Sequence, residues 1–510
     1  MSKILILDFG SQYTQLIARK VRELGVYSEI VPFNTPVARI RKEAPGALIL
    51  SGGPRSVYEK GAPLPSPGIF ELGLPVLGVC YGLQVMAHLL GGKIVPSGKR
   101  EFGFASLKVL DRKGLLAGVR DKRQVWMSHG DKPERVPPGF RVTASTPNTR
   151  VAAVEDRERR LFGVQFHPEV IHTRDGNKIL ANFLFRVAGL EADWNMASFI
   201  KRKVAEVRAA VGRGRVICGL SGGVDSLVTS LIVHKAIGDR LTCIFVDNGL
   251  LRKGQYHELM ENFRRKFSLN VKGIDASEVF LEKLRGVIAP EKKRKKIGGL
   301  FIEIFEREAK KIGGADFLAQ GTIYQDVIES NPVKGPSSVI KSHHNVGGLP
   351  KGLRFKLIEP LRELFKDEVR TLALELDVDK DFITQHPFPG PGLAVRIVGE
   401  VDREGLDILR EADDILLHEV RRAGLYHKLW QAFAVLLPVR SVGVMGDQRT
   451  YQRVVVLRLV QSTDGMTANW YPVPAPLLAR ISTRIVNEVR GVNRVVLDVT
   501  TKPPGTIEWE

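Results

Sequence analysis

The stretch Ser221–Ser226, which reads S-G-G-V-D-S, constrains this chain more than any other. It follows a short apolar run, Val216–Cys218, and precedes a second apolar run, Leu227–Val233. The pattern predicts a strand, a tight glycine loop and the start of a helix. There, unpaired backbone N–H groups and the positive end of the helix dipole point at one place, which favours a phosphate group. A Walker A loop is excluded because the loop lacks G-K-[S/T].

The residue types in this loop suit phosphate binding. The two glycines let the backbone approach a ligand closely. The two serines add hydroxyl donors, and Asp225 can hold a Mg²⁺ that bridges phosphates. A plain strand-to-helix turn with a serine cap is the alternative. The complete stretch resembles the pyrophosphatase loop of the ATP-pyrophosphatases, which split ATP between the α and β phosphates and adenylate a substrate oxygen. That resemblance implies that six residues contact ATP: Ser221, Gly222, Gly223, Val224, Asp225 and Ser226.

A second candidate site is centred on Cys80, within G-V-C-Y-G. An apolar run, Val76–Val79, precedes the cysteine and a helical pattern, Leu83–Leu90, follows it. We therefore predict a sharp turn that exposes the sulfur and a helix N-terminus that favours the thiolate. His167 lies at the end of a predicted strand, with Glu169 two residues further on. Such a histidine can act as a base toward a cysteine, with the carboxylate orienting it.

The other two cysteines, Cys218 and Cys243, lie inside apolar runs and are predicted to be core residues. The Cys80 stretch, together with S-G-G-P at Ser51–Pro54 and F-G-V-Q-F-H-P-E at Phe162–Glu169, resembles the class I glutamine amidotransferases over roughly residues 1–190. The resemblance implies a Cys80, His167 and Glu169 triad that hydrolyses glutamine to glutamate and ammonia through a thioester. It also implies an oxyanion hole at Gly53 and Tyr81 and a glutamine pocket lined by Gln84 and Ser128–Asp131. A purely structural role for His129 is equally compatible with the sequence.

Short apolar runs alternate with helical patterns up to about residue 380, which indicates α/β architecture with mostly parallel sheets. The run His386–Gly392, which reads H-P-F-P-G-P-G, cannot be a helix and interrupts any strand. We place a boundary there, because the rest mixes helix and strand. The predicted fold is two doubly wound α/β domains, 1–190 and 191–385, followed by a small α+β domain, 386–510.

Composition limits the partners and the location. Three cysteines do not suggest a disulfide framework, and no apolar run has the length of a membrane span, so we expect a cytoplasmic protein without membrane contact. The net charge of +20 favours anionic partners such as nucleotides or RNA, although a basic solubilising surface is an equal alternative. No RNA-recognition signature is present, so we expect small-molecule substrates and no nucleic acid. The basic run Lys292–Lys296 is either a solvated helical face or a mobile lid over the nucleotides.

Further motifs extend a resemblance over the whole chain. They are Ala319–Tyr324, Ile340–Asn345, His386–Gly392 and the tail Thr500–Glu510, and they resemble the glutamine-hydrolysing GMP synthase family. Gln325 departs from that family, which usually has proline there. The resemblance implies that ATP adenylates the C2 oxygen of XMP and that ammonia then displaces AMP to give GMP. It further implies Mg²⁺ at Asp225 and a homodimer formed through the C-terminal domain.

The same resemblance implies further ligand contacts. Val246 would meet adenine through its backbone and Lys341 would contact a phosphate. Five residues would contact XMP: Arg294, Gln431, Asp447, Lys502 and Glu508.

Other functions fit these motifs less well. A tRNA-modifying adenylating enzyme would use the positive charge, but would need an RNA-binding appendage and a sulfur-carrying cysteine near the loop. NAD and asparagine synthesis use other amidases. A catalytically silent nucleotide sensor would have no need of complete motifs for both reactions.

Overall fold

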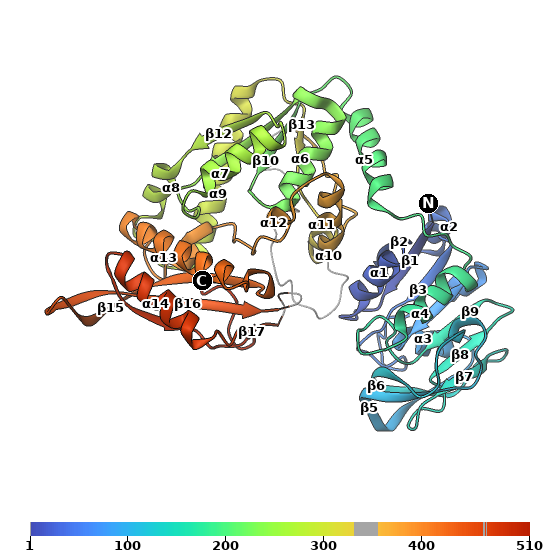
Figure 1. Ribbon diagram of the computed structural model, residues 1–510. Coiled ribbons are helices and arrows are strands. Elements are labelled where there is room, and N and C mark those ends of the chain that lie inside the picture. Colours follow the sequence, from blue (N-terminus) through green and yellow to red (C-terminus); the bar gives the residue numbers. More distant parts are fainter. Residues whose placement is uncertain (1, 331–354, 463–464, 466) are drawn as a thin grey trace. The chain divides into compact units, whose positions relative to one another are not determined.

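A computed structural model describes residues 2–330, 355–462, 465 and 467–510 (Figure 1). The described residues form two compact units, one ending at Phe199 and the other beginning at Ile200. Helix α5, Met196–Val211, contains the point at which the first unit ends and the second begins.

The described residues of the first unit form a nine-stranded sheet in the order β2-β1-β3-β4-β9-β8-β7-β5-β6. From β2 to β9 the strands run parallel, and from β9 to β6 the pairs are antiparallel. The central parallel strands are apolar and buried because helices cover the sheet. The strands are β1 Lys3–Asp8, β2 Tyr27–Pro32, β3 Ala47–Leu50, β4 Val76–Val79, β5 Lys93–Val109, β6 Arg123–Arg135, β7 Arg141–Ser145, β8 Ala153–Asp156 and β9 Leu161–Val164.

Helix α3 of this unit packs against β3, β4 and β9, and α1 packs against α4. Helix α4 continues directly into a π-helical turn, η3. The helices are α1 Thr14–Glu23, α2 Val37–Glu43, α3 Tyr81–Leu89 and α4 Gly176–Ala181, with η1 Pro67–Glu71, η2 Gly114–Leu116 and η3 Asn182–Val187.

The second unit contains a five-stranded parallel sheet in the order β12-β11-β10-β13-β14. The strands β11 and β13 lie on opposite sides of β10, so the strand order reverses at β10. In open parallel sheets such a switch point is where ligands bind, beyond the carboxyl ends of the strands. The strands are β10 Val216–Leu220, β11 Leu241–Asp247, β12 Val271–Asp275, β13 Phe317–Ala319 and β14 Lys356–Ile358.

Helix α6 packs on β10, β11 and β13, and α9 packs on β11. The basic run 292–296 lies in α9, where Lys293 is buried and Lys292 is exposed. The helices around this sheet are α6 Val224–Ile237, α7 Gln255–Glu261, α8 Ser277–Leu284, α9 Pro290–Ile312, α10 Tyr324–Ser330, α11 Lys366–Glu375 and α12 Lys380–Ile383, with η4 Gly238–Arg240 and η5 Asn262–Lys266.

The C-terminal part of the second unit is built on a long antiparallel hairpin, β15 Gln431–Met445 and β16 Gln448–Gln461 (Figure 1). Helix α13, Arg403–Arg422, packs against β15, and its apolar residues share one core with β11 and α9. The strand β18, Val492–Leu497, adds to β16 in parallel. The remaining elements are η6 Gly392–Arg396, η7 Tyr426–Lys428, β17 Asn469–Trp470 and α14 Ala475–Glu488.

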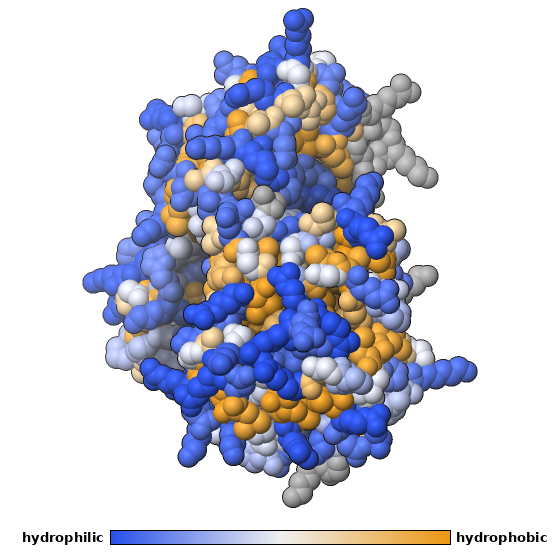
Figure 2. Space-filling model, turned by 90° about the vertical axis from the view of Figure 1, so that its right-hand side faces the viewer, coloured by the Kyte–Doolittle hydropathy of each residue, from blue (hydrophilic) through white to orange (hydrophobic). Residues whose placement is uncertain are grey.

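The predicted fold class is confirmed, because large, mostly parallel sheets precede a smaller C-terminal sheet. The proline-rich run begins without helix or strand, as its composition predicted. The contacts separate two units, and the further division at residue 385 stays a prediction. Within the described ranges, no helix combines the length and the apolar composition needed to cross a membrane. The face drawn in Figure 2 is largely hydrophilic, with separate hydrophobic patches.

Candidate active sites

Cys80 occupies a strained turn between β4 and α3. Its φ of +52° and ψ of −104° are unusual for a residue with a side chain, and α3 begins directly after it at Tyr81. A Cβ added at Gly78 or Gly82 would lie 2.6 or 2.2 Å from backbone atoms of neighbouring segments. The spacing of glycines around the cysteine therefore lets the turn pack tightly between strand and helix.

His167 and Glu169 lie beside this cysteine. Nδ1 of His167 is 2.7 Å from Oε1 of Glu169, and both side chains are buried. Burial acts to lower the pKa of His167, but the charges of Glu169 and of the Cys80 sulfur outweigh it and raise the pKa well above its ordinary value. The structure thus brings a sulfur, an imidazole and a carboxylate together in the order that nucleophilic catalysis uses.

The loop that carries S-G-G-P closes one side of this site. A Cβ on Gly53 would lie 3.0 Å from the Tyr81 ring, and one on Gly52 would lie 3.3 Å from Cε1 of His167. Gln84 donates from Nε2 to the backbone oxygen of Asp131, at 3.0 Å. The residues predicted for the oxyanion hole and the glutamine pocket are therefore neighbours of the Cys80 turn.

Ser128 and His129 have different surroundings. The Cys80 sulfur is 3.6 Å from the backbone oxygen of Ser128. The His129 ring is buried, with Nε2 3.5 Å from Oε2 of Glu101. Thr146 and Thr149 donate to the same carboxylate, at 3.0 and 2.6 Å. This network favours a structural role for His129.

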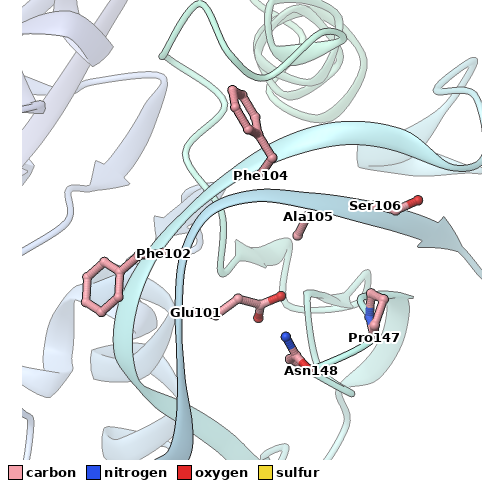
Figure 3. A pocket seen from close by; sticks show the side chains of 7 residues that line it. All are labelled: Glu101, Phe102, Phe104, Ala105, Ser106, Pro147 and Asn148. Carbon is pink, nitrogen blue, oxygen red and sulfur yellow. The ribbon is translucent and has the colours of Figure 1, made fainter.

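A shallow cavity of about 220 Å³ lies next to this network, on the curved hairpin of β5 and β6 (Figure 3). The Glu101 carboxylate and the Asn148 side chain face each other across it, while Phe102 and Phe104 point away. The cavity is therefore polar on the side of the buried carboxylate.

The S-G-G-V-D-S stretch forms the strand, loop and helix that its sequence predicted. It follows β10, α6 begins at Val224, and Gly222 has a φ of +81°. Hydroxyl groups close the loop: the Ser221 amide donates to Oγ of Ser226 at 3.2 Å, and the Gly223 amide donates to Oγ of Ser221 at 3.3 Å. The loop is an exposed turn at the N-terminus of a 14-residue helix, which is a suitable place for an anion.

Asp225 pairs with a lysine that the sequence did not indicate. Lys366 Nζ, at the start of α11, lies 2.7 and 2.6 Å from the two carboxylate oxygens. Gly321 packs against the same turn, since a Cβ there would lie 3.1 Å from the carbonyl carbon of Asp225. One carboxylate near phosphates fits a Mg²⁺ that arrives with a nucleotide. Over the described parts of the chain, no group of three or more His, Cys, Asp or Glu side chains could form a metal cage.

Two of the predicted ATP contacts, Val246 and Lys341, lie outside the S-G-G-V-D-S stretch. Val246 lies one residue before the end of β11, the neighbour of β10, so it is near the sheet edge that carries the loop. Lys341 lies outside the described residues.

Four of the five predicted XMP contacts, Arg294, Gln431, Lys502 and Glu508, lie in the C-terminal tail or contact it. Gln431 donates from Nε2 to Oε1 of Glu508 at 2.7 Å, and the Arg294 guanidinium donates to the backbone oxygen of Glu510. Lys502 donates to the backbone oxygen of Gly465 at 2.8 Å. Asp447 is not brought to this group within one chain, because it forms the turn after β15 and Gln431 begins that strand.

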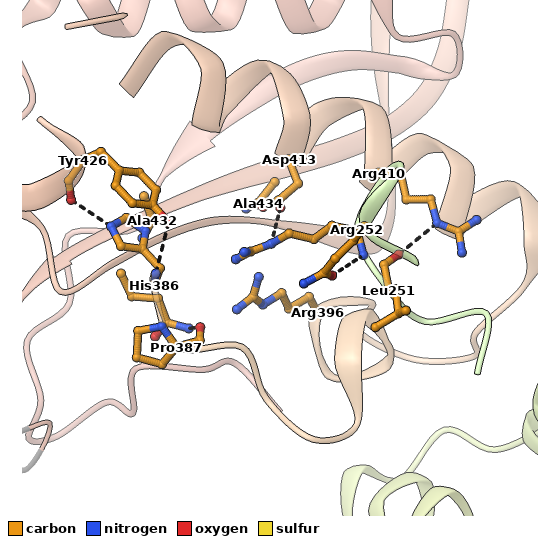
Figure 4. Close-up of polar contacts among 12 residues, drawn as sticks. Leu251, Arg252, His386, Pro387, Arg396, Arg410, Asp413, Tyr426, Ala432 and Ala434 are labelled. Carbon is orange, nitrogen blue, oxygen red and sulfur yellow. Dashed lines mark hydrogen bonds and ion pairs between the residues drawn. The ribbon is translucent and has the colours of Figure 1, made fainter. Parts of the chain in front are cut away.

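A buried polar cluster adjoins the tail, and sequence reasoning missed it (Figure 4). Arg252 and Arg396 both lie against the Phe388 ring, at 4.7 and 5.2 Å from its centroid. Nε of Arg252 is 3.2 Å from Oδ2 of Asp413, which α13 supplies. Burial lowers the pKa of Arg252, Asp413 opposes this shift, and Arg396 adds to it. No spacing in the sequence connects these residues, so only the fold reveals the cluster.

Comparison with known proteins identifies first the class of the first unit and then the family of the whole chain. Residues 5–187 match the family model described as Glutamine amidotransferase class-I, so the first unit is of that class. Residues 418–509 match the model described as GMP synthase C terminal domain. Over its full length, the chain is 56% identical to the GMP synthase (glutamine-hydrolyzing) of Carboxydothermus hydrogenoformans, with 100% of both chains covered. It is also 56% identical to that of Aquifex aeolicus, with 99% of both covered. The chain therefore belongs to the glutamine-hydrolysing GMP synthase family.

Proposed function

We propose that this chain catalyses the ATP-dependent amination of XMP to GMP, using ammonia from glutamine and releasing AMP, pyrophosphate and glutamate. One observation carries this conclusion: a single chain contains both the Cys80 site and the S-G-G-V-D-S stretch after β10, here called the phosphate loop. Full-length identity of 56% to relatives named as glutamine-hydrolysing GMP synthases supports it. The tRNA-modifying alternative is not favoured, because these relatives match from end to end.

In the first reaction, the Cys80 thiolate attacks the side-chain amide carbon of glutamine. His167, held by Glu169, donates a proton to the departing nitrogen, so that ammonia leaves and a thioester remains. His167 then accepts a proton from water, which attacks the thioester and releases glutamate. Backbone N–H groups near Gly53 and Tyr81 would donate to the oxyanion, and Gln84 would line the pocket.

In the second reaction, the C2 oxygen of XMP attacks the α-phosphorus of ATP and pyrophosphate leaves. Ammonia then attacks C2 and AMP departs, which gives GMP. The amides and hydroxyls of Ser221–Ser226 would hold the phosphates, with Lys341 as a further phosphate contact and the Val246 backbone as the adenine contact. Asp225 would hold a Mg²⁺ that arrives with ATP and neutralises phosphate charge.

The XMP site would combine Arg294, Gln431, Lys502 and Glu508 from the second unit. Lysine and arginine suit the phosphate, and the Glu508 carboxylate suits the N–H edge of the base. The fifth predicted residue, Asp447, lies at the other end of a 15-residue strand from Gln431. Its contact with XMP would therefore require the other chain of a homodimer.

We also propose the finer organisation that the sequence predicted. The chain would have three domains, 1–190, 191–385 and 386–510, and would dimerise through the last. A cytoplasmic location is supported by three free thiols, as expected in a reducing compartment.

The direct test is to incubate the protein with ATP, Mg²⁺, glutamine and XMP. We expect GMP, AMP, pyrophosphate and glutamate in equal amounts, and ammonia should replace glutamine. A matched reaction without XMP should give no sustained AMP release. Folded protein that consumes ATP and glutamine without forming GMP would contradict the proposal.

A further inference from the structure

The Glu508 carboxylate is held by three donated hydrogen bonds. Arg396 donates from Nε to Oε2 at 3.1 Å and from Nη2 to Oε1 at 2.9 Å. Gln431 donates to Oε1 at 2.7 Å. The paired arginine bonds form a planar fork, which fixes the carboxylate in direction as well as in distance.

Arg396 is itself rigidly placed. Its side chain is fully buried, and its guanidinium lies 4.2 Å from the centroid of Phe433 and 5.2 Å from that of Phe388. Among the described residues Nη1 has no hydrogen-bond partner, so the side-chain hydrogen bonds of Arg396 all go to Glu508. A fully buried cation with a single carboxylate partner is costly unless that partner stays in place.

Gln431 is oriented by the same arrangement. Its Nε2 donates to the backbone oxygen of Pro387 at 2.9 Å as well as to Glu508. Both amide hydrogens are thus engaged, and the side chain has one orientation that satisfies them.

Within the part of the chain that the structure describes, these contacts leave the Glu508 carboxylate with one open acceptor position. Each carboxylate oxygen has two in-plane positions. Oε1 takes two donors and Oε2 takes one, and the Glu508 side chain is 19% exposed, so the open position on Oε2 is available at a partly exposed group. A ligand at this position must donate a hydrogen bond.

We propose that Arg396 is a positioning residue that presents Glu508 to the N–H edge of the purine base with a single free acceptor. This inference rests on the proposed function, in which that base belongs to XMP. In this scheme Arg396 does not touch the substrate. It affects XMP affinity only because it holds the Glu508 carboxylate in place.

The test is a double-mutant cycle on XMP affinity. R396K keeps the charge but loses the fork, and E508Q removes the carboxylate. We expect each to raise the KM for XMP by roughly 10- to 100-fold, the range for a lost charged hydrogen bond, with a smaller change in kcat. The double variant R396K/E508Q should be no weaker than E508Q alone, because both changes remove the same contact.

R484K is the matched control. Arg484 also pairs with a buried carboxylate, that of Glu419, at 3.0 Å, but on the surface of α13 and α14. The KM of the R484K variant for XMP should equal that of the unmodified protein. If R396K does not fold, F433L replaces it, since this change removes one ring beside the guanidinium and should raise the KM for XMP only when Glu508 is present.

The outcomes separate the two proposals. An E508Q variant with normal XMP affinity would overturn the XMP site itself. Weak binding in E508Q combined with normal binding in R396K, or effects that add in the double variant, would leave the XMP site standing and overturn the positioning role of Arg396.

Discussion

Lys366 Nζ lies within 2.7 Å of both carboxylate oxygens of Asp225, although 141 residues separate them in the chain. Asp225 is the second residue of α6, and Lys366 is the first residue of α11. The pair therefore puts a cation and an anion at the N-terminus of the helix that follows the phosphate loop. If phosphates bind there as proposed, the lysine would share its charge with them.

We expect Lys366→Met to impair GMP formation with glutamine and with ammonia alike. The loss should be about 10²- to 10³-fold in kcat, the scale for one preorganised donor at a transition state. Glutamine hydrolysis at Cys80 should persist, because it belongs to the other unit. Initial rates with each nitrogen source measure this, with Lys380→Met as the control. Equal losses in both lysine variants would indicate general damage.

Asp225→Asn tests the partner of that lysine. The amide keeps the shape of the carboxylate but cannot neutralise Mg²⁺, so synthesis from either nitrogen source should be lost. Basal glutaminase activity should remain. Near-normal ammonia-dependent synthesis in this variant would count against the pyrophosphatase-loop assignment.

Cys80→Ala should act in the opposite way. Removal of the nucleophile should reduce glutamine-dependent GMP formation by at least about 10³-fold, while ammonia-dependent formation continues. The substitution also removes the sulfur that helps raise the pKa of His167, so this pKa should be lower in the variant. The matched control is Cys243→Ala, a buried cysteine of β11. Glutamine use at the normal rate by the Cys80 variant would exclude the triad.

Local patterns predicted the parts of both sites that adjacent residues build. The turn at Cys80 depends on glycines two residues away, and the phosphate loop depends on the strand and helix that flank it. The pairs Arg396–Glu508 and Lys293–Glu510 span 112 and 217 residues. They form only when distant segments pack, and no periodicity records them. The basic run was ambiguous for the same reason, since its charge did not reveal that Lys293 is buried.

Stability should fall in mild acid because of His386. Its ring stacks on Tyr426, accepts a hydrogen bond from the Ala432 amide and contacts a backbone oxygen through Nε2. Burial is the main cause that lowers the pKa of His386 from 6.5 to about 4. The unfolded chain therefore binds a proton near pH 6.5, whereas the folded chain does so only near pH 4. The stabilising effect is present above pH 6.5 and is lost as the pH falls to 4, by about 3 kcal/mol.

Urea unfolding of the second unit at pH 7 and pH 5 measures this effect. In His386→Asn the same comparison should show a smaller fall, because the titrating group is absent. A fall of equal size in both proteins would assign the acid sensitivity to other groups.

Chain ends usually tolerate truncation, but we expect that the C-terminal tail does not. Deleting Thr506–Glu510 should weaken XMP binding severely and leave glutamine hydrolysis unchanged. Lys502→Ala should weaken XMP affinity by roughly 1.5–3 kcal/mol, the range for a lost charge-assisted contact. XMP titration of both variants measures this, and unchanged affinity would place the tail outside the XMP site.

The structure adds a second cost to that truncation. Lys293 is fully buried, donates to the backbone oxygens of Ala394 and Ile397 at 3.1 and 2.7 Å, and pairs with the Glu510 carboxylate. Burial lowers the pKa of Lys293, and Glu510 opposes that shift. Glu510→Ala removes the opposing charge, so it should destabilise the second unit by roughly 3–5 kcal/mol. Lys293→Met in the same chain should restore much of this loss, because no buried charge then lacks a partner. The urea midpoints of Glu510→Ala and of the double variant Lys293→Met/Glu510→Ala measure this effect. If the double variant is less stable than Glu510→Ala, the ion pair does not explain how the tail is held.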